Sequence, residues 1–188
     1  MAAPVGRKVY YWDASLFLAW LTNEPREAAV MEGIAEVARD VNDNKAVLIT
    51  SVITLTEVLE ARLSDEARQK FRDLFKRRNV KQINVDQRIA QLAQEIRQHY
   101  SQQNPSVRIE TPDSIHLATA ILYKADELHT TDGSGKRKRP SDLISLSGNV
   151  TGRYPLQIVL PRSKQVGLFP GQIPPPSRGS DAKKTEQP

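Results

Sequence analysis

Short runs of strongly apolar residues alternate along the chain with longer segments in which apolar residues recur every three or four positions. The short runs are rich in valine, isoleucine, leucine and aromatic residues, which favour strands. They predict buried strands at residues 9–12, 46–50, 80–85, 128–131 and 156–160.

The segments between these runs have the apolar spacing of amphipathic helices. They predict helices at residues 16–21 and 25–41 and further helices that begin at Ser51, Asp65, Asp86 and Thr111. Pro25 suits the first position of its helix. Ser51 and Asp86 are residue types that cap helix N-termini. Residues 133–155 lack either period and are expected to be irregular.

Strands that alternate with helices indicate an α/β fold, with a mostly parallel sheet and helices on both of its faces. The periodic pattern ends near Arg162, and five of the 12 prolines follow residue 169. We therefore expect a folded domain over residues 1–165 and a disordered, proline-rich and polar tail over residues 166–188.

Composition narrows the function classes. The net charge of +5 permits binding to RNA or DNA but does not require it. The absence of cysteine excludes disulfides, zinc-thiolate sites and iron–sulfur clusters. No apolar run reaches about 18 residues, and residues 1–7 lack a secretory signal, so we expect a cytoplasmic protein with no membrane partner.

Four carboxylates fall at positions where a parallel sheet gathers its ligands. Asp13 and Asp132 follow predicted strands directly, Asp113 lies in the first turn of a predicted helix, and Glu57 lies about one and a half turns into another. Ligands bind outside the carboxyl ends of such strands. Since only three histidines are present, a metal site here would use carboxylates and a hard cation such as Mg²⁺ or Mn²⁺.

The segments around these residues resemble the PIN-domain nucleases, and among them most closely the VapC-type toxins of toxin–antitoxin pairs. The resemblance spans residues 8–162 and is carried by residues 11–15, 51–58, 111–120 and 130–132. It implies a three-layer α/β/α domain with a Mg²⁺- or Mn²⁺-dependent endoribonuclease activity. It also implies a homodimer and an antitoxin protein that covers the acidic site.

Carried over by position, the resemblance assigns the catalytic metal site to Asp13, Glu57, Asp113 and Asp132. Ser15 and Thr131 match auxiliary hydroxyl positions that could bond a carboxylate, the water or a phosphate oxygen. Two features depart from the family pattern: residues 133–140 form a longer connection than usual, and the chain continues beyond Arg162.

The basic run in this longer connection, Lys136, Arg137, Lys138 and Arg139, has two interpretations. It is either a solvated loop or an RNA-binding loop that holds phosphates beside the site. His116 is expected to be a packed or capping residue rather than a contact to substrate. Trp12, Phe17 and Trp20 are expected in the core or at a dimer interface rather than as stacking platforms for bases.

Each carboxylate also has a purely structural interpretation. Asp113 would favour the helix dipole, and Asp132 with Gly133 is a common turn pair. Two competing functions therefore stay open: a non-catalytic RNA-binding or scaffolding module on the same fold, and a phosphotransfer protein. The second is disfavoured because Ser15 stands where a haloacid-dehalogenase phosphatase would need a second aspartate.

Overall fold

The computed structural model describes residues 6–23, 26–104, 107–135 and 139–163. Its centre is a single sheet of five parallel strands in the order β3-β2-β1-β4-β5. The strands are β1 (Lys8–Trp12), β2 (Ala46–Ser51), β3 (Val80–Ile83), β4 (Glu127–His129) and β5 (Gln157–Val159). The predicted parallel α/β architecture is confirmed.

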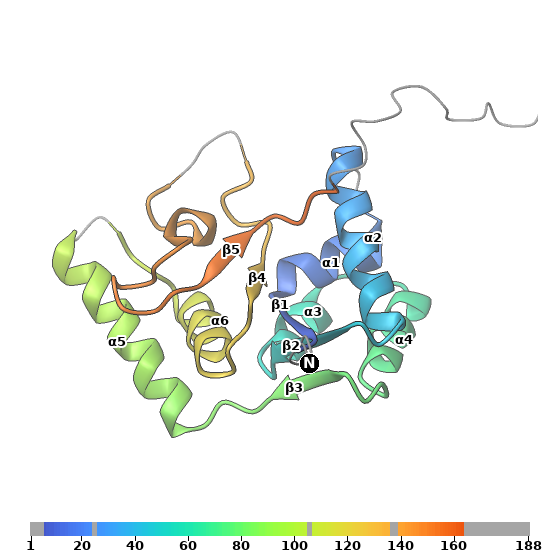
Figure 1. Cartoon of the computed structure of the whole chain (residues 1–188), viewed down its shortest axis with the longest axis horizontal. Helices are drawn as coiled ribbons and strands as arrows, with labels where there is room; N and C mark the ends of the chain where they lie inside the picture. Colours follow the sequence, from blue (N-terminus) through green and yellow to red (C-terminus); the bar gives the residue numbers. More distant parts are fainter. Residues whose placement is uncertain (1–5, 24–25, 105–106, 136–138, 164–188) are drawn as a thin grey trace, which may run out of the picture.

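Helices cover both faces of this sheet (Figure 1). Within the described residues they are α1 (Ala14–Thr22), α2 (Ala28–Asn42), α3 (Thr54–Glu60), α4 (Asp65–Leu74), α5 (Gln87–Gln103), α6 (Thr111–Leu122) and the 3₁₀ helix η1 (Leu143–Leu146). Helices α1 to α4 pack on one face, and α5, α6 and η1 pack on the other. The result is a three-layer α/β/α domain with two hydrophobic cores.

Strand β1 shows how alternation divides the two cores. Tyr11 packs with α5 and α6, whereas Tyr10 and Trp12 point to the opposite core with α1 to α4. Trp12 contacts Phe17 edge to face, with ring centroids 5.3 Å apart. Burial of each such ring stabilises the fold by about 2–3 kcal/mol. Trp12 and Phe17 are therefore core residues, as expected.

Polar side chains fix where several helices begin. Asp13 and Asp86 accept hydrogen bonds from the backbone N–H groups of α1 and α5, as N-caps do. Ser51 was expected to cap the next helix, but it is the last residue of β2, and α3 begins only at Thr54. Ser64 caps α4, a role that the sequence pattern did not reveal.

Strands β3 and β4 are shorter at their carboxyl ends than the apolar pattern predicts. β3 ends at Ile83 and β4 at His129, two residues earlier than expected in each case. After β4 the backbone N–H of Thr130 still donates to the carbonyl of Val159, while the Thr130 side chain bonds to Asp13. Thr130 and Thr131, which leave β4, contact Asp13 and Ser15.

The segment after β5 packs closely against α2. Arg162 pairs with Glu27 at 2.6 Å, and the backbone N–H of Ser163 donates to the carbonyl of Ala29. A Cβ atom at Gly33 would lie 2.7 Å from the backbone of Arg162, so only glycine permits this approach. The domain therefore includes Ser163. The predicted tail at residues 166–188 lies outside the described residues.

The described helices include none that is both long and apolar enough to cross a membrane.

Candidate functional site

The four predicted carboxylates line one cavity of about 700 Å³ beyond the carboxyl ends of the strands. The full lining consists of Asp13, Ala14, Ser15, Leu18, Glu57, Arg108, Glu110, Asp113, His116, Asp132, Arg139 and Ser141. These residues come from segments far apart in the sequence, which the parallel sheet brings together. A larger cavity of about 860 Å³ beside Trp20 and α4 contains no histidine and none of these residues.

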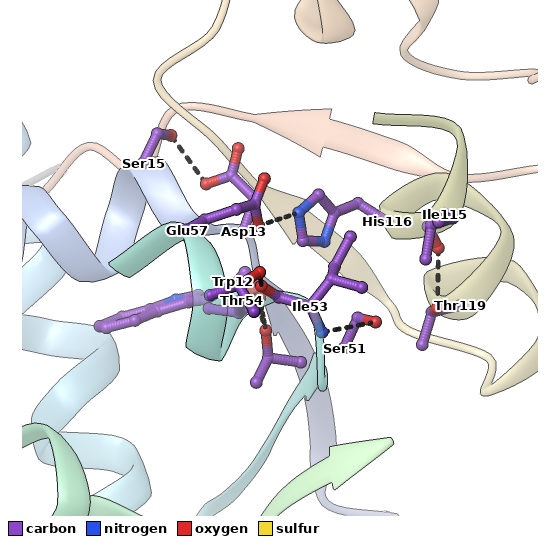
Figure 2. A network of polar contacts seen from close by, with 12 residues as sticks. Trp12, Asp13, Ser15, Ser51, Ile53, Thr54, Glu57, Ile115, His116 and Thr119 are labelled. Carbon is purple, nitrogen blue, oxygen red and sulfur yellow. Dashed lines mark hydrogen bonds and ion pairs between the residues drawn. The ribbon is translucent and has the colours of Figure 1, made fainter. Parts of the chain in front are cut away.

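Asp13 is the most firmly held of the four carboxylates. Its Oδ1 accepts hydrogen bonds from the Ser15 hydroxyl at 2.7 Å and the Leu16 backbone N–H at 3.0 Å. Its Oδ2 accepts one from the Thr130 hydroxyl at 2.6 Å. Burial raises the pKa of Asp13, and these three donors oppose that rise. Figure 2 shows Ser15 reaching toward the Asp13 carboxylate.

Asp132 is tied to the same network through its backbone. Its N–H donates to the Thr130 hydroxyl oxygen at 2.9 Å, and its Oδ2 accepts the backbone N–H of Leu143 at 2.7 Å. Leu143 begins η1, on the far side of the longer connection at residues 133–140. That connection therefore leaves Asp132 in the cavity and fixes its direction.

The hydroxyl beside the first aspartate comes from Thr130 rather than from Thr131. Thr131 contributes its backbone N–H, which donates to the Ser15 hydroxyl oxygen at 2.9 Å. Among the described residues its own hydroxyl has no hydrogen-bond partner. The role predicted for the Thr131 hydroxyl stays a prediction, whereas Ser15 contacts a carboxylate in the way the sequence suggested.

Glu57 lies in the first turn of α3, nearer the start of its helix than predicted. Its Oε2 is 3.0 Å from Nε2 of His116, which projects from α6 (Figure 2). His116 is only 2% exposed and is packed, as expected. It also contacts a candidate catalytic carboxylate, which the sequence did not reveal.

Asp113 has no hydrogen-bond donor on its carboxylate among the described residues. Burial, together with the neighbouring charges of Asp132, Asp13 and Glu110, raises its pKa to about 6. His116 opposes this rise. A carboxylate that is partly buried, without a hydrogen-bond donor and close to like charges is costly to the metal-free fold. A cation would remove that cost.

The donor set fits a hard divalent cation in its chemistry. All four carboxylates offer oxygen ligands, and Asp113 carries the electrostatic signature of mutual repulsion. No group of three or more acidic or histidine side chains within the described residues is already close enough to hold a metal ion. Binding would therefore have to draw the carboxylates together across the cavity.

Two arginine side chains offset part of the negative charge of this lining. Arg108, from the loop before α6, and Arg139, from the predicted basic loop, both line the cavity. Asp142 accepts from the backbone N–H and the Nε of Arg139, at 2.6 and 3.0 Å, and so anchors that end of the loop. Lys136, Arg137 and Lys138 lie outside the described residues.

Sequence reasoning missed Thr130, Arg108 and Glu110 as residues of this site. Thr130 is adjacent to a predicted position, and only the turn after β4 decides which hydroxyl faces Asp13. Arg108 and Glu110 lie in a loop without any period, so no sequence signal aims them at the cavity.

Comparison with solved structures supports the fold. The toxin–antitoxin complex VapBC2 from Rickettsia felis, bound to a DNA fragment from its promoter, matches with a TM-score of 0.54 and 16% identity. The match covers 80% of this chain and 98% of that one. VapC20 from Mycobacterium tuberculosis, a sarcin-ricin loop cleaving toxin, matches with a TM-score of 0.49 and 16% identity. That match covers 66% of this chain and 90% of the other.

No curated protein matches the chain. The family model described as PIN domain matches residues 10–139, a segment that includes the four predicted carboxylates of the cavity. Together with the five-stranded parallel sheet, this match shows that the chain belongs to the PIN domain family.

Proposed function

We propose that this protein is a metal-dependent endoribonuclease that cleaves RNA phosphodiester bonds. The observation that carries the proposal is the convergence of Asp13, Glu57, Asp113 and Asp132 on one cavity. PIN-domain nucleases generally use divalent metal ions, and these four side chains would hold Mg²⁺ or Mn²⁺. Such an ion would supply activation of a water and neutralisation of the charge that develops on the phosphate.

The chain's own residues would prepare this reaction. Ser15, Thr130 and the N–H of Leu16 fix the direction of the Asp13 carboxylate, so that it needs no reorganisation when the ion binds. Asp113 carries no such donors within the described residues and is the carboxylate freest to move toward an ion. The raised pKa of Asp113 is expected for a carboxylate that has no cation bound to offset burial and the neighbouring charges.

Cations beside the acidic cavity would hold the RNA backbone. Arg108 and Arg139 line the cavity, and we propose that the whole basic loop, Lys136 to Arg139, binds phosphates there. Replacing these four residues by serine should weaken RNA binding and flatten its salt dependence, with little change in cleavage at saturating RNA. Unchanged affinity and salt slope would make the loop a solvated connection.

The partner proposal is that of a toxin held by an antitoxin. The Rickettsia felis match is a toxin–antitoxin complex, which suggests a similar partner for this chain. An antitoxin segment with a basic side chain would complement the five carboxylates of the cavity, Glu110 included. We further propose a homodimer, which light scattering at micromolar concentration would test.

We propose that the folded domain ends shortly after the last described segment and that residues 166–188 are a separate tail. A chain truncated after Ser163 should fold and retain activity, because it keeps the described contacts of Arg162 and Ser163 to α2. The matched control is truncation after Tyr154, which removes β5 and should prevent folding. If truncation after Ser163 also prevents folding, the assignment of residues 166–188 as a separate tail is wrong.

The function itself is tested with purified protein and a mixed RNA pool, incubated with Mg²⁺, with Mn²⁺ or with EDTA. We expect internal cleavage with either metal and none with EDTA. The folded Asp113→Asn variant is the matched control because it keeps the side-chain shape and removes one charge. Cleavage in EDTA, or equal cleavage by the variant, would contradict the proposal.

A further inference from the structure

A chain of buried polar contacts runs from the core of the domain to Glu57. The backbone N–H of Ser51 donates to the Tyr11 hydroxyl oxygen at 3.0 Å. That hydroxyl lies 2.7 Å from Nδ1 of His116, whose Nε2 contacts Glu57 at 3.0 Å. The residues come from β2, β1, α6 and α3, so the chain of contacts ties together four elements.

These side-chain contacts and the backbone between Ser51 and Glu57 together form a closed ring. Ser51 is the last residue of β2, and α3, which carries Glu57, begins only three residues later. Through their hydrogen bonds, Tyr11 and His116 therefore link Ser51, before the short β2–α3 connection, to Glu57, just after it. Because hydrogen bonds hold the chain both at Ser51 and at Glu57, the Glu57 side chain has little freedom to move away from the cavity.

The hydrogen-bond chemistry gives one arrangement in which every atom is satisfied. An ionised Glu57 carboxylate has only acceptors, so Nε2 of His116 must carry the proton that joins them. Ser51 already donates to the Tyr11 oxygen, and the Tyr11 O–H is then free to donate to Nδ1.

Both intermediate side chains are rigid. Tyr11 is fully buried and His116 is 2% exposed, and their rings meet at 69° with centroids 5.7 Å apart. Side chains locked by packing cannot adopt other rotamers without opening the core. The other carboxylate oxygen of Glu57, Oε1, accepts no hydrogen bond from the described residues and is available to the cavity.

We propose that Tyr11 and His116 are positioning residues that hold Glu57 in place to bind a divalent cation. The proposal deepens the proposed function, on which it rests for the nature of the cation. Neither residue needs to touch the cation or RNA. Partners that orient a metal ligand in this way commonly change metal affinity or activity by about 10–100-fold when removed.

The test uses the full chain and Mn²⁺ alone, with binding followed by electron paramagnetic resonance. Tyr11→Phe removes the hydroxyl and keeps the ring, and we expect it to weaken Mn²⁺ binding about 10-fold. His116→Leu should weaken it further. His116→Gln can still donate to Glu57 and should recover part of the loss.

Tyr10→Phe is the matched control, because it removes a hydroxyl from the neighbouring residue of β1, whose ring packs in the other core. Melting temperatures in EDTA separate positioning from folding. If Tyr11→Phe melts earlier but binds Mn²⁺ as tightly as Tyr10→Phe, its role is structural and the proposal is overturned.

RNA cleavage distinguishes this proposal from the proposed function. Wild-type protein that binds Mn²⁺ but cleaves no RNA would count against the nuclease alone, and the affinities of the variants would still decide the role of Tyr11 and His116. Wild-type protein that binds no Mn²⁺ would overturn the positioning proposal together with the metal site.

Discussion

Asp13 and Asp113 line the same cavity but are held in opposite ways. Asp13 is 6% exposed, and three donors on its two oxygens compensate its charge. Asp113 is partly exposed and has no donor on its carboxylate within the described residues. Burial, followed by the charges of neighbouring carboxylates, instead raises its pKa to about 6. One corner of the site is preorganised by the fold, and the other is left unpaired.

The difference indicates that Asp13 stabilises the fold, whereas Asp113 would be useful only for binding a ligand. Asp13 caps α1 and connects β1 to the turn after β4, so it stabilises the domain without any metal. Asp113 destabilises the metal-free domain through repulsion and burial. Strain of this kind at a polar cavity is a sign of function rather than of packing.

The largest expected effect comes from the same substitution at the two positions, measured by denaturant unfolding in EDTA. Asp13→Ala should destabilise the domain by about 2 kcal/mol or more, because it removes an N-cap and leaves buried donors unpaired. Asp113→Ala should stabilise it by about 1 kcal/mol, since removal of repulsion exceeds the lost helix-dipole interaction. Changes of the same sign would break the comparison.

A second prediction concerns the hydroxyl that supports Asp13. Thr130→Val leaves one oxygen of Asp13 and the N–H of Asp132 without their partner, which should cost about 1–3 kcal/mol. Thr131→Val is the matched control and should cost less than about 0.5 kcal/mol. Thermal melts of both variants decide the matter. Equal losses would show that either hydroxyl can support the carboxylate.

Much of this arrangement follows from the sequence, and the remainder does not for physical reasons. The apolar periods predict the sheet and its helices, and the positions of Asp13 and Asp132 after strands predict that they share an edge. Whether Thr130 or Thr131 faces Asp13 depends on one backbone turn. The contact between His116 and Glu57 joins α6 and α3, which lie on opposite faces of the sheet, and no local pattern encodes where their ends meet.

A third prediction is a smaller dependence of stability on pH. The pKa of Asp113 rises from 3.8 to about 6 on folding, so the folded protein binds the proton more tightly than the unfolded chain. Stability in EDTA should therefore fall as pH rises from about 4 to 6 and then level. The shift in the pKa of Asp113 corresponds to a change of about 3 kcal/mol in the free energy of unfolding. Solvent screening at this partly exposed group reduces that change to about 1–2 kcal/mol.

The control for this pH dependence is Asp113→Asn, because burial also raises the pKa of Asp13 and adds a dependence of the same sign. The wild type should lose about 1–2 kcal/mol more than the variant across this range. The pKa of Glu127 is lowered to about 2 by His129 and Lys8, so this residue adds a dependence of the opposite sign as the unfolded chain titrates. That contribution is common to both proteins and cancels in the comparison. Identical pH profiles would mean that Asp113 does not carry the strain.

The central claim is that the Asp113 carboxylate, which has no hydrogen-bond donor within the described residues, helps to bind a divalent cation. A Mn²⁺ titration of thermal stability tests it most directly. The wild type should start from the lower melting temperature in EDTA and rise with Mn²⁺, because binding to the folded state stabilises it. Asp113→Asn should start higher and rise much less. An equal rise in both proteins, or no rise in the wild type, would contradict the account.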